Sequence, residues 1–214
     1  GNVDYFENTG SATAPQFGSL KANQFNLTAT EFNEAKPAFV DLDSDGDLDV
    51  FVGNETKDFI YFENTSQSLN SPSFAAYLEN PFSLSKNRSY VYSSPALVDI
   101  NGNGLTDLFI GSDSGDIHYF KNIGTTTLPE FDQVITNPFS LSDIGSATTP
   151  AFADFDDDGD FDVFIGNSEG TTLYFENTGT STAPSFEAAV SNPFGIPKVT
   201  SYSKPAFVDI NNDG

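Results

Sequence analysis

Residues 37–53 read Pro-Ala-Phe-Val-Asp-Leu-Asp-Ser-Asp-Gly-Asp-Leu-Asp-Val-Phe-Val-Gly, an acidic loop between two short apolar runs. Within residues 41–49, side-chain oxygens stand at positions 1, 3, 5 and 9, and Gly46 stands at position 6. Calcium takes six to eight oxygen ligands, and glycine permits the sharp turn that wraps such an ion. The stretch therefore predicts a calcium loop inside a β-hairpin.

The loop is repeated along the chain. Complete copies occupy residues 99–107 and 154–162, and a fourth copy starts at residue 209. The first positions of the copies, residues 41, 99, 154 and 209, are 58, 55 and 55 residues apart. Tyr-Phe-x-Asn tracts recur with the same period, at 5–8, 61–64, 119–122 and 174–177. Such self-similarity is the signature of a repeat architecture, so residues 1–214 are expected to form a single repeat region.

Each loop position has an expected role in holding calcium. Positions 1, 3, 5 and 9 would supply side-chain oxygens, and position 7 its backbone carbonyl. The expected ligands are Asp41, Asp43, Asp45, Asp47 and Asp49; Asp99, Asn101, Asn103, Leu105 and Asp107; Asp154, Asp156, Asp158, Asp160 and Asp162; and, in the truncated fourth copy, Asp209, Asn211 and Asp213. The sequence thus predicts three complete calcium sites. The second should be the weakest, because two of its ligands are neutral amides.

Two other interpretations of the loop fit less well. An EF-hand needs a bidentate Glu at position 12 and flanking helices, whereas position 12 here is Val52, Ile110 or Ile165. A turn rich in Asp and Asn explains these residue types in general. It does not explain acids packed at alternate positions, which repel one another without a cation.

Four short strands are expected in each repeat. In the first complete repeat, apolar runs at 38–40 and 50–53 indicate inner strands buried on both faces. A third strand is expected at 60–64 and a fourth near 74–77, and helix is expected to be essentially absent. Four strands per repeat of about 55 residues predict an all-β fold of β-propeller-type blades. The repeated Phe residues, such as Phe39, Phe51 and Phe62, are expected to form the core between blades.

The string Pro-Ala-Phe-x-Asp-x-Asp-x-Asp-Gly-Asp-x-Asp-Val-Phe-x-Gly resembles the FG-GAP or VCBS-type repeats of calcium-binding β-propellers, which include the head of the integrin α subunit. The resemblance covers nearly the whole chain. It implies a blade whose first hairpin holds calcium, in proteins that are commonly adhesive or extracellular. The family is functionally broad, so the resemblance does not by itself fix a function.

The two ends of the sequence fall inside repeats. Residues 1–5 align with 115–119, which places the start in a turn, and the sequence stops inside the fourth loop. About four blades are therefore expected, beginning and ending mid-blade, as a segment of a longer repetitive chain. Both a closed propeller and an extended fibre of repeats fit this pattern.

The composition restricts the partners. The formal net charge is −23, with only eight Lys and Arg residues, which excludes nucleic acid as a partner. No apolar run approaches the ~20 residues of a membrane span. Cysteine is absent, so disulfides are too, and metal ions would take over their stabilising role. Weak calcium loops fill where calcium reaches ~0.1–1 mM, which favours an extracellular or cell-surface location.

A structural or adhesive role without catalysis is the expected function. Partners other than calcium would be further copies of the repeat, or a protein or glycan ligand. The alternative is a propeller within a carbohydrate-active hydrolase or lyase, which a non-repeated polar cluster in the central channel would favour. The single histidine, His118, replaces Ile60 and Leu173 of other repeats and is expected to be structural.

Overall fold

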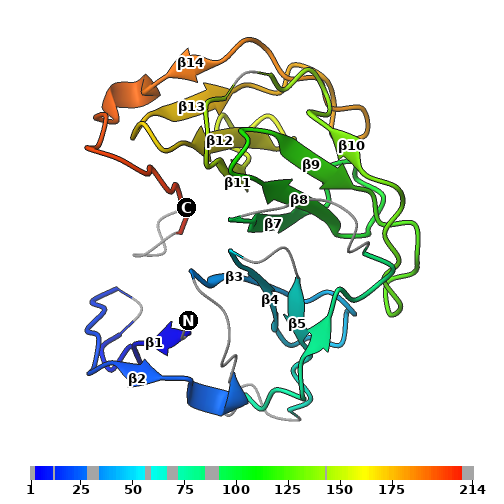
Figure 1. Ribbon diagram of the computed structural model, residues 1–214, viewed down its shortest axis with the longest axis vertical. Helices are drawn as coiled ribbons and strands as arrows, with labels where there is room; N and C mark the ends of the chain where they lie inside the picture. Colours follow the sequence, from blue (N-terminus) through cyan, green and yellow to red (C-terminus); the bar gives the residue numbers. More distant parts are fainter. Residues whose placement is uncertain are drawn as a thin grey trace.

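The chain forms repeated antiparallel sheets around a common centre. The computed structural model describes residues 3–11, 13–27, 34–55, 59–66, 72–84, 92–142 and 144–208. Within them lie three four-stranded sheets and one two-stranded sheet. Figure 1 shows the first strand of each four-stranded sheet near the centre and the fourth at the periphery. The predicted all-β fold is confirmed.

Each four-stranded sheet is a meander in sequence order. The first contains β3 (Lys36–Val40), β4 (Asp49–Gly53), β5 (Ile60–Phe62) and β6 (Leu78–Glu79). The second contains β7 (Ser94–Val98), β8 (Asp107–Gly111), β9 (Ile117–Phe120) and β10 (Ile135–Thr136). The third contains β11 (Thr149–Ala153), β12 (Asp162–Gly166), β13 (Thr172–Phe175) and β14 (Val190–Ser191).

The two-stranded sheet corresponds to the outer half of such a meander. It pairs β1 (Asp4–Tyr5) with β2 (Lys21–Ala22), and Tyr5 aligns with Tyr61 in the third strand of the next sheet. Two short 3-10 helices, Gln24–Asn26 and Pro193–Gly195, follow β2 and β14. They occupy Asn-x-Phe tracts in which the asparagine and the phenylalanine have positive φ.

The second strand of every complete sheet is buried on both faces, as predicted. All residues of β4, β8 and β12 are buried. Successive side chains of a strand point to opposite faces, and here they enter different cores. Val50 and Val52 pack in the core shared with the β1–β2 sheet, whereas Phe51 packs in the core shared with the β7–β10 sheet. The β3–β6 sheet and the β7–β10 sheet each therefore separate two hydrophobic cores.

The structure departs from the sequence prediction in three places. The run at 38–40 was expected to be buried on both faces, but no residue of β3 is fully buried, and Pro37 and Phe39 are exposed. The fourth strand lies at Leu78–Glu79 rather than near 74–77, because Phe74 forms an isolated bridge with Asn64 instead. Phe51 and Phe62 are buried in the core as expected, but Phe39 is 56% exposed. The prediction for Phe39 was wrong because its side chain borders an open groove beside the β1–β2 sheet.

Glycine ends each second strand because the next sheet passes directly over it. A Cβ added to Gly111 would lie 2.2 Å from the Thr148 carbonyl oxygen, and one added to Gly166 would lie 2.0 Å from that of Ser203. Both approaches are far inside van der Waals contact. The absence of a side chain at this position lets neighbouring sheets approach one another at the centre.

We expect Gly111→Ala to destabilise the protein by about 2 kcal/mol or more, because backbone must move to admit the methyl group. Denaturant unfolding measures the change. Gly18→Ala is the control, since a Cβ there has no neighbour nearer than 3.6 Å. Equal stabilities of the two variants would contradict the tight packing of sheets described here.

Candidate metal centre

The acidic loops connect the first and second strands of the complete sheets. They lie between β3 and β4, β7 and β8, and β11 and β12. At position 6 the backbone φ is 94° in Gly46, 81° in Gly104 and 94° in Gly159. Glycine adopts this left-handed conformation without steric cost, so the three loops share one turn geometry.

The aspartate at position 1 closes each loop. Its Oδ2 accepts a hydrogen bond from the glycine N–H at position 6, over 3.2 Å in the first loop, 2.7 Å in the second and 3.1 Å in the third. The acceptors are Asp41, Asp99 and Asp154. The side chain at position 1 thus closes each loop through a hydrogen bond within the protein.

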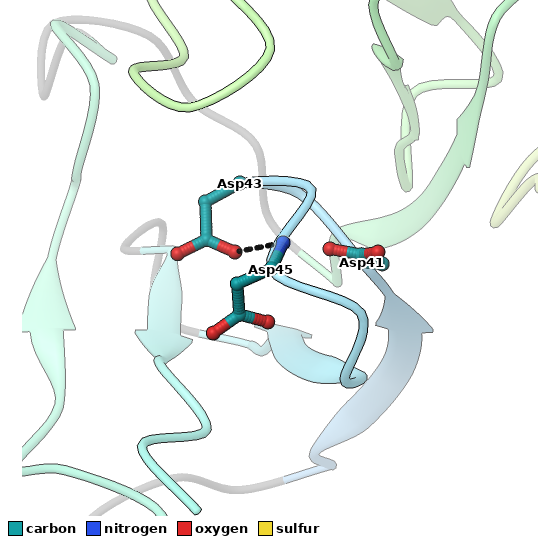
Figure 2. A group of neighbouring side chains, drawn as sticks. All are labelled: Asp41, Asp43 and Asp45. Carbon is teal, nitrogen blue, oxygen red and sulfur yellow. Dashed lines mark hydrogen bonds between the residues drawn. The ribbon is translucent and has the colours of Figure 1, made fainter. Parts of the chain in front are cut away.

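In the first and third loops, the carboxylates at positions 3 and 5 lie close to the carboxylate at position 1. One carboxylate oxygen from each of Asp41, Asp43 and Asp45 lies within 4.8 Å of the others, and Asp154, Asp156 and Asp158 repeat the arrangement. Figure 2 shows the first group, with the hydrogen bond of 3.3 Å from Asp45 N to Asp43 Oδ1. Three carboxylates in this space repel one another.

Several carboxylate oxygens in the loops are buried without a hydrogen bond. They include Asp41 Oδ1 at position 1, and the Oδ1 atoms of Asp47 and Asp160 at position 7. Burying a charged oxygen without a partner is costly. Burial and the neighbouring acids also raise the pKa of Asp47 and Asp160. A bound divalent cation would satisfy the Asp41 oxygen, so position 1 fits the ligand set expected of a metal loop, in which position 7 supplies its backbone carbonyl and not its side chain.

The aspartate at position 9 has a second set of partners. Asp49 is fully buried at the start of β4. Its Oδ1 accepts from Asn64 N at 2.8 Å, and its Oδ2 accepts from the Tyr61 hydroxyl at 2.7 Å and from Leu42 N at 3.3 Å. A carboxylate has about four acceptor positions, so one remains for an ion. This side chain therefore ties the loop to the third strand.

The same contact recurs in the other two sheets. Asp107 accepts from the Tyr119 hydroxyl at 3.0 Å and from Asn122 N at 2.7 Å. Asp162 accepts from the Tyr174 hydroxyl at 3.0 Å and from Asn177 N at 2.8 Å. Sequence reasoning assigned these aspartates to the metal and missed the tyrosine and asparagine. The signal was available, because the tyrosine always follows by 12 residues and the asparagine by 15.

Loop two differs from the other loops in the interaction between the side chains at positions 3 and 9. The carboxylate of Asp43 contributes to the raised pKa of Asp49, and that of Asp156 to the raised pKa of Asp162. In loop two, position 3 is Asn101, whose side-chain N–H donates to Asp107 Oδ2. A neutral donor thus takes the place of a repelling acid. Loop two therefore lacks the repulsion between positions 3 and 9 that the other two loops have.

Burial is the main influence on the position-9 acids. It raises the pKa of Asp49 to about 6 and that of Asp107 to about 6, against hydrogen bonds from backbone and tyrosine that lower it. Burial also raises the pKa of the Asp162 carboxyl. The partner tyrosines Tyr61 and Tyr119 have raised pKa values for the same reason, so their hydroxyls remain protonated donors.

The remaining expected ligands are placed as follows. Asn103 Oδ1 accepts from Leu105 N at 2.8 Å, which repeats the position-5 contact of Asp45 with Asp47 N at 3.1 Å. The loop-three equivalent joins Asp158 and Asp160, also at 3.1 Å. Asp209, Asn211 and Asp213 lie outside the described residues.

Two segments of the chain that contain these loops match a known repeat family. Residues 99–165 and 154–214 each match the FG-GAP-like repeat, and together these segments cover more than half of the chain. The chain belongs to the FG-GAP-like repeat family. No curated protein sequence matches the chain.

A small polar hollow lies where the starts of the first strands of these FG-GAP-like repeats converge. Its volume is about 330 Å³, and the residues around it include Lys36, Asp113, Thr149 and Lys204. Burial and the charge of Lys204 lower the pKa of Lys36, whose ammonium donates to the Tyr92 carbonyl at 2.9 Å. His118 lies elsewhere, buried in β9 with Nδ1 3.3 Å from the Thr136 hydroxyl. No helix in the described part of the chain is long and apolar enough to cross a membrane.

We expect Tyr119→Phe to cost about 1–3 kcal/mol, because it removes a donor from a buried carboxylate. Chemical denaturation measures the loss. Tyr5→Phe is the matched control: it occupies the same position in the β1–β2 sheet, and its hydroxyl makes no hydrogen bond among the described residues. If both variants lose the same stability, the contact with Asp107 contributes nothing.

The position-9 acids also predict a pH dependence. Burial raises the pKa of Asp49 and that of Asp107 to about 6 in the folded protein, above the ~3.9 of an unfolded aspartate, so in metal-free protein their ionised form is the less stable one. Stability contributed by these groups is present below pH ~4 and lost as pH rises through ~6. Calcium should add more stability as the acids ionise.

Thermal melts between pH 4.5 and 7.5, on protein passed over a chelating resin and with calcium restored, test this prediction. The melting temperatures with and without calcium should diverge as pH rises. Parallel curves would show that these carboxylates do not take part in cation binding.

Proposed function

We propose that the acidic loops bind calcium and that the ions hold a β-propeller-type repeat assembly in a structural or adhesive role outside the cell. The observation that carries the proposal is Asp41 Oδ1, a buried carboxylate oxygen with no hydrogen bond, beside the carboxylates of Asp43 and Asp45. Hard oxygen ligands without His or Cys favour calcium or magnesium over zinc. A loop of this flexibility suits calcium better than the strict octahedral geometry of magnesium.

The ion would act as a structural support. It would neutralise acids that the fold brings together, and it would fix the hairpin from which the buried second strand begins. Binding to the native state alone stabilises by RT ln(1 + [L]/Kd), about 2.7 kcal/mol per site at 100-fold saturation. This role suits a chain without cysteine, which has no disulfides to stabilise it.

A propeller-type arrangement is supported by the central hollow. Its lining comes from the starts of the first strands in three consecutive sheets and from residues 202–204, which occupy the same register of the next repeat. The proposed role is non-catalytic, because the densest acids belong to the loops. The alternative, a propeller within a carbohydrate-active enzyme, would use this hollow, which brings together two lysines and two acids.

Calcium titration by calorimetry on the metal-depleted chain tests the proposal. We expect three ions per chain, with the second loop weakest because of Asn101 and Asn103, and affinities near ~0.1–1 mM as in extracellular modules. A stoichiometry near zero, a preference for zinc, or dissociation constants below a micromolar would each contradict it.

Substitutions in the third loop identify the site. Asp156→Ala should remove one calcium ion and lower the melting temperature measured with calcium. Asp157→Asn is the control, because Asp157 is exposed at position 4 with φ of 62°, a conformation that asparagine tolerates. It removes the same charge and should still bind three ions. Equal losses in both variants would mean that the assignment of loop positions is wrong.

A further inference from the structure

Loop two contains both Asn-Gly pairs of the sequence. They are Asn101-Gly102 and Asn103-Gly104, and their asparagines stand at positions 3 and 5, where loops one and three carry aspartate. An asparagine followed by glycine is open to attack by its own backbone, because glycine has no side chain to keep the next peptide nitrogen away from the amide carbon. Loop two therefore has two places at which a neutral side chain can become an acidic one without an enzyme.

The reaction is intramolecular and consumes only water. The glycine nitrogen forms a bond to the Cγ atom of the asparagine, and the bond from Cγ to the amide nitrogen breaks. The proton of the glycine nitrogen leaves with the amide nitrogen as ammonia, and a succinimide ring remains. Water then adds to one carbonyl carbon of the ring, the bond from that carbon to the ring nitrogen breaks, and the nitrogen regains a proton. The side-chain amide is thereby replaced by a carboxylate.

Hydrogen bonds protect the second pair from this reaction. The Gly104 N–H donates to Asp99 Oδ2 at 2.7 Å, so the nitrogen that would attack is already engaged with a carboxylate. Asn103 is held as well, because its Oδ1 accepts from Leu105 N at 2.8 Å and its N–H donates to Asp99 Oδ1 at 3.1 Å. Bonds to a charged acceptor are the stronger kind. Deamidation at Asn103 would have to break them.

The first pair lacks this protection. Gly102 is exposed, and its N–H makes no hydrogen bond within the described part of the chain. The Asn101 side chain is held by a single hydrogen bond, from its Nδ2 to Asp107 Oδ2. Turning the amide toward the Gly102 nitrogen breaks that one bond. The two pairs thus have the same sequence and lie in the same loop, but only the Gly102 nitrogen is free to attack.

Deamidation of Asn101 would change the charge that faces the position-9 aspartate. The Asn101 amide donates to Asp107, whereas a carboxylate in its place would have no proton to donate and would repel it. The position-3 acids of loops one and three already act on their own position-9 acids in this way. Loop two would then have acids at positions 1, 3 and 9, and a cation would relieve their repulsion.

We propose that Asn101 is a deamidation site, at which the Gly102 nitrogen starts the conversion of Asn101 to aspartate and so strengthens calcium binding by loop two. The part of this proposal that concerns calcium rests on the function proposed above. The hydrogen bonds from residues 103 and 104 to Asp99 hold the backbone that follows. They favour opening of the ring to aspartate over isoaspartate, in which the backbone is longer by one carbon.

Peptide mapping by mass spectrometry tests the site, on the full chain kept at pH 8 with a chelator. In the folded chain, Asn101 should deamidate at least tenfold faster than Asn103, with aspartate as the main product. In the chain unfolded by urea, the two should react at similar rates, because the hydrogen bonds that protect Asn103 are lost. The proposal is overturned if Asn101 does not react in the folded chain, if Asn103 reacts as fast, or if isoaspartate predominates.

Two variants that add the same charge test the consequence for calcium. Asn101→Asp should bind calcium at loop two about tenfold more tightly than the unmodified chain, because affinity rises with the number of charged ligands. In chelator it should also melt at a lower temperature, since Asp107 loses a donor. Asn103→Asp is the matched control: its Oδ1 still accepts from Leu105 N, so the metal-free melting temperature should fall less.

The outcomes separate this proposal from the proposed function. Unchanged calcium affinity of loop two in Asn101→Asp, with loops one and three occupied, would overturn the consequence drawn for calcium. If no loop bound calcium, the proposed function would fail, and the peptide map would still decide whether Asn101 is modified.

Discussion

A carboxylate removed from water begins the second strand of each complete sheet, and the other features of the repeat are arranged around it. Asp49, Asp107 and Asp162 join three segments: the acidic loop, the third strand through a tyrosine, and the following turn through an asparagine. A buried charge is tolerated only with several donors. The tyrosine and the asparagine supply these donors, and each stands at a constant number of residues after the aspartate. Beside it, the acids at positions 1, 3 and 5 of the first and third loops lie close together, where their charges repel one another.

The sequence alone predicts the parts of the fold that follow from local pattern. Alternate acids around a glycine predict the loops, and continuous apolar runs predict the two-sided burial of β4, β8 and β12. The spacing of the motifs predicts the repeat length. The sequence also predicted that the acids at positions 1, 3 and 5 converge, as they do in the first and third loops, whereas their role as metal ligands stays a prediction. The structure shows in addition that Asp41 Oδ1 is buried without a hydrogen bond, which the sequence could not indicate.

Other features depend on long-range contacts and were not predicted. Phe39 has the same local sequence as Phe152, yet it is 56% exposed because the neighbouring sheet there has only two strands. The aspartate at position 9 also accepts hydrogen bonds from a tyrosine 12 residues later and an asparagine 15 residues later. This role was not predicted, because it depends on the third strand lying beside the loop. The fourth strand was misplaced because β6, β10 and β14 contain only two residues each, too few to show a periodicity.

The β3–β6 and β7–β10 sheets each separate two cores, so residues that are adjacent in the sequence are not the residues that share contacts. Phe51 and Val52 are adjacent in the chain but pack in different cores, whereas Phe109 and Phe152 are distant in the chain and pack in one. Residues that share contacts are the ones whose mutational effects couple. Substitutions at adjacent positions of one strand should therefore combine almost additively, and substitutions of contacting residues in two neighbouring sheets should not. Energetic coupling in this protein consequently extends from one repeat to the next rather than along any single strand.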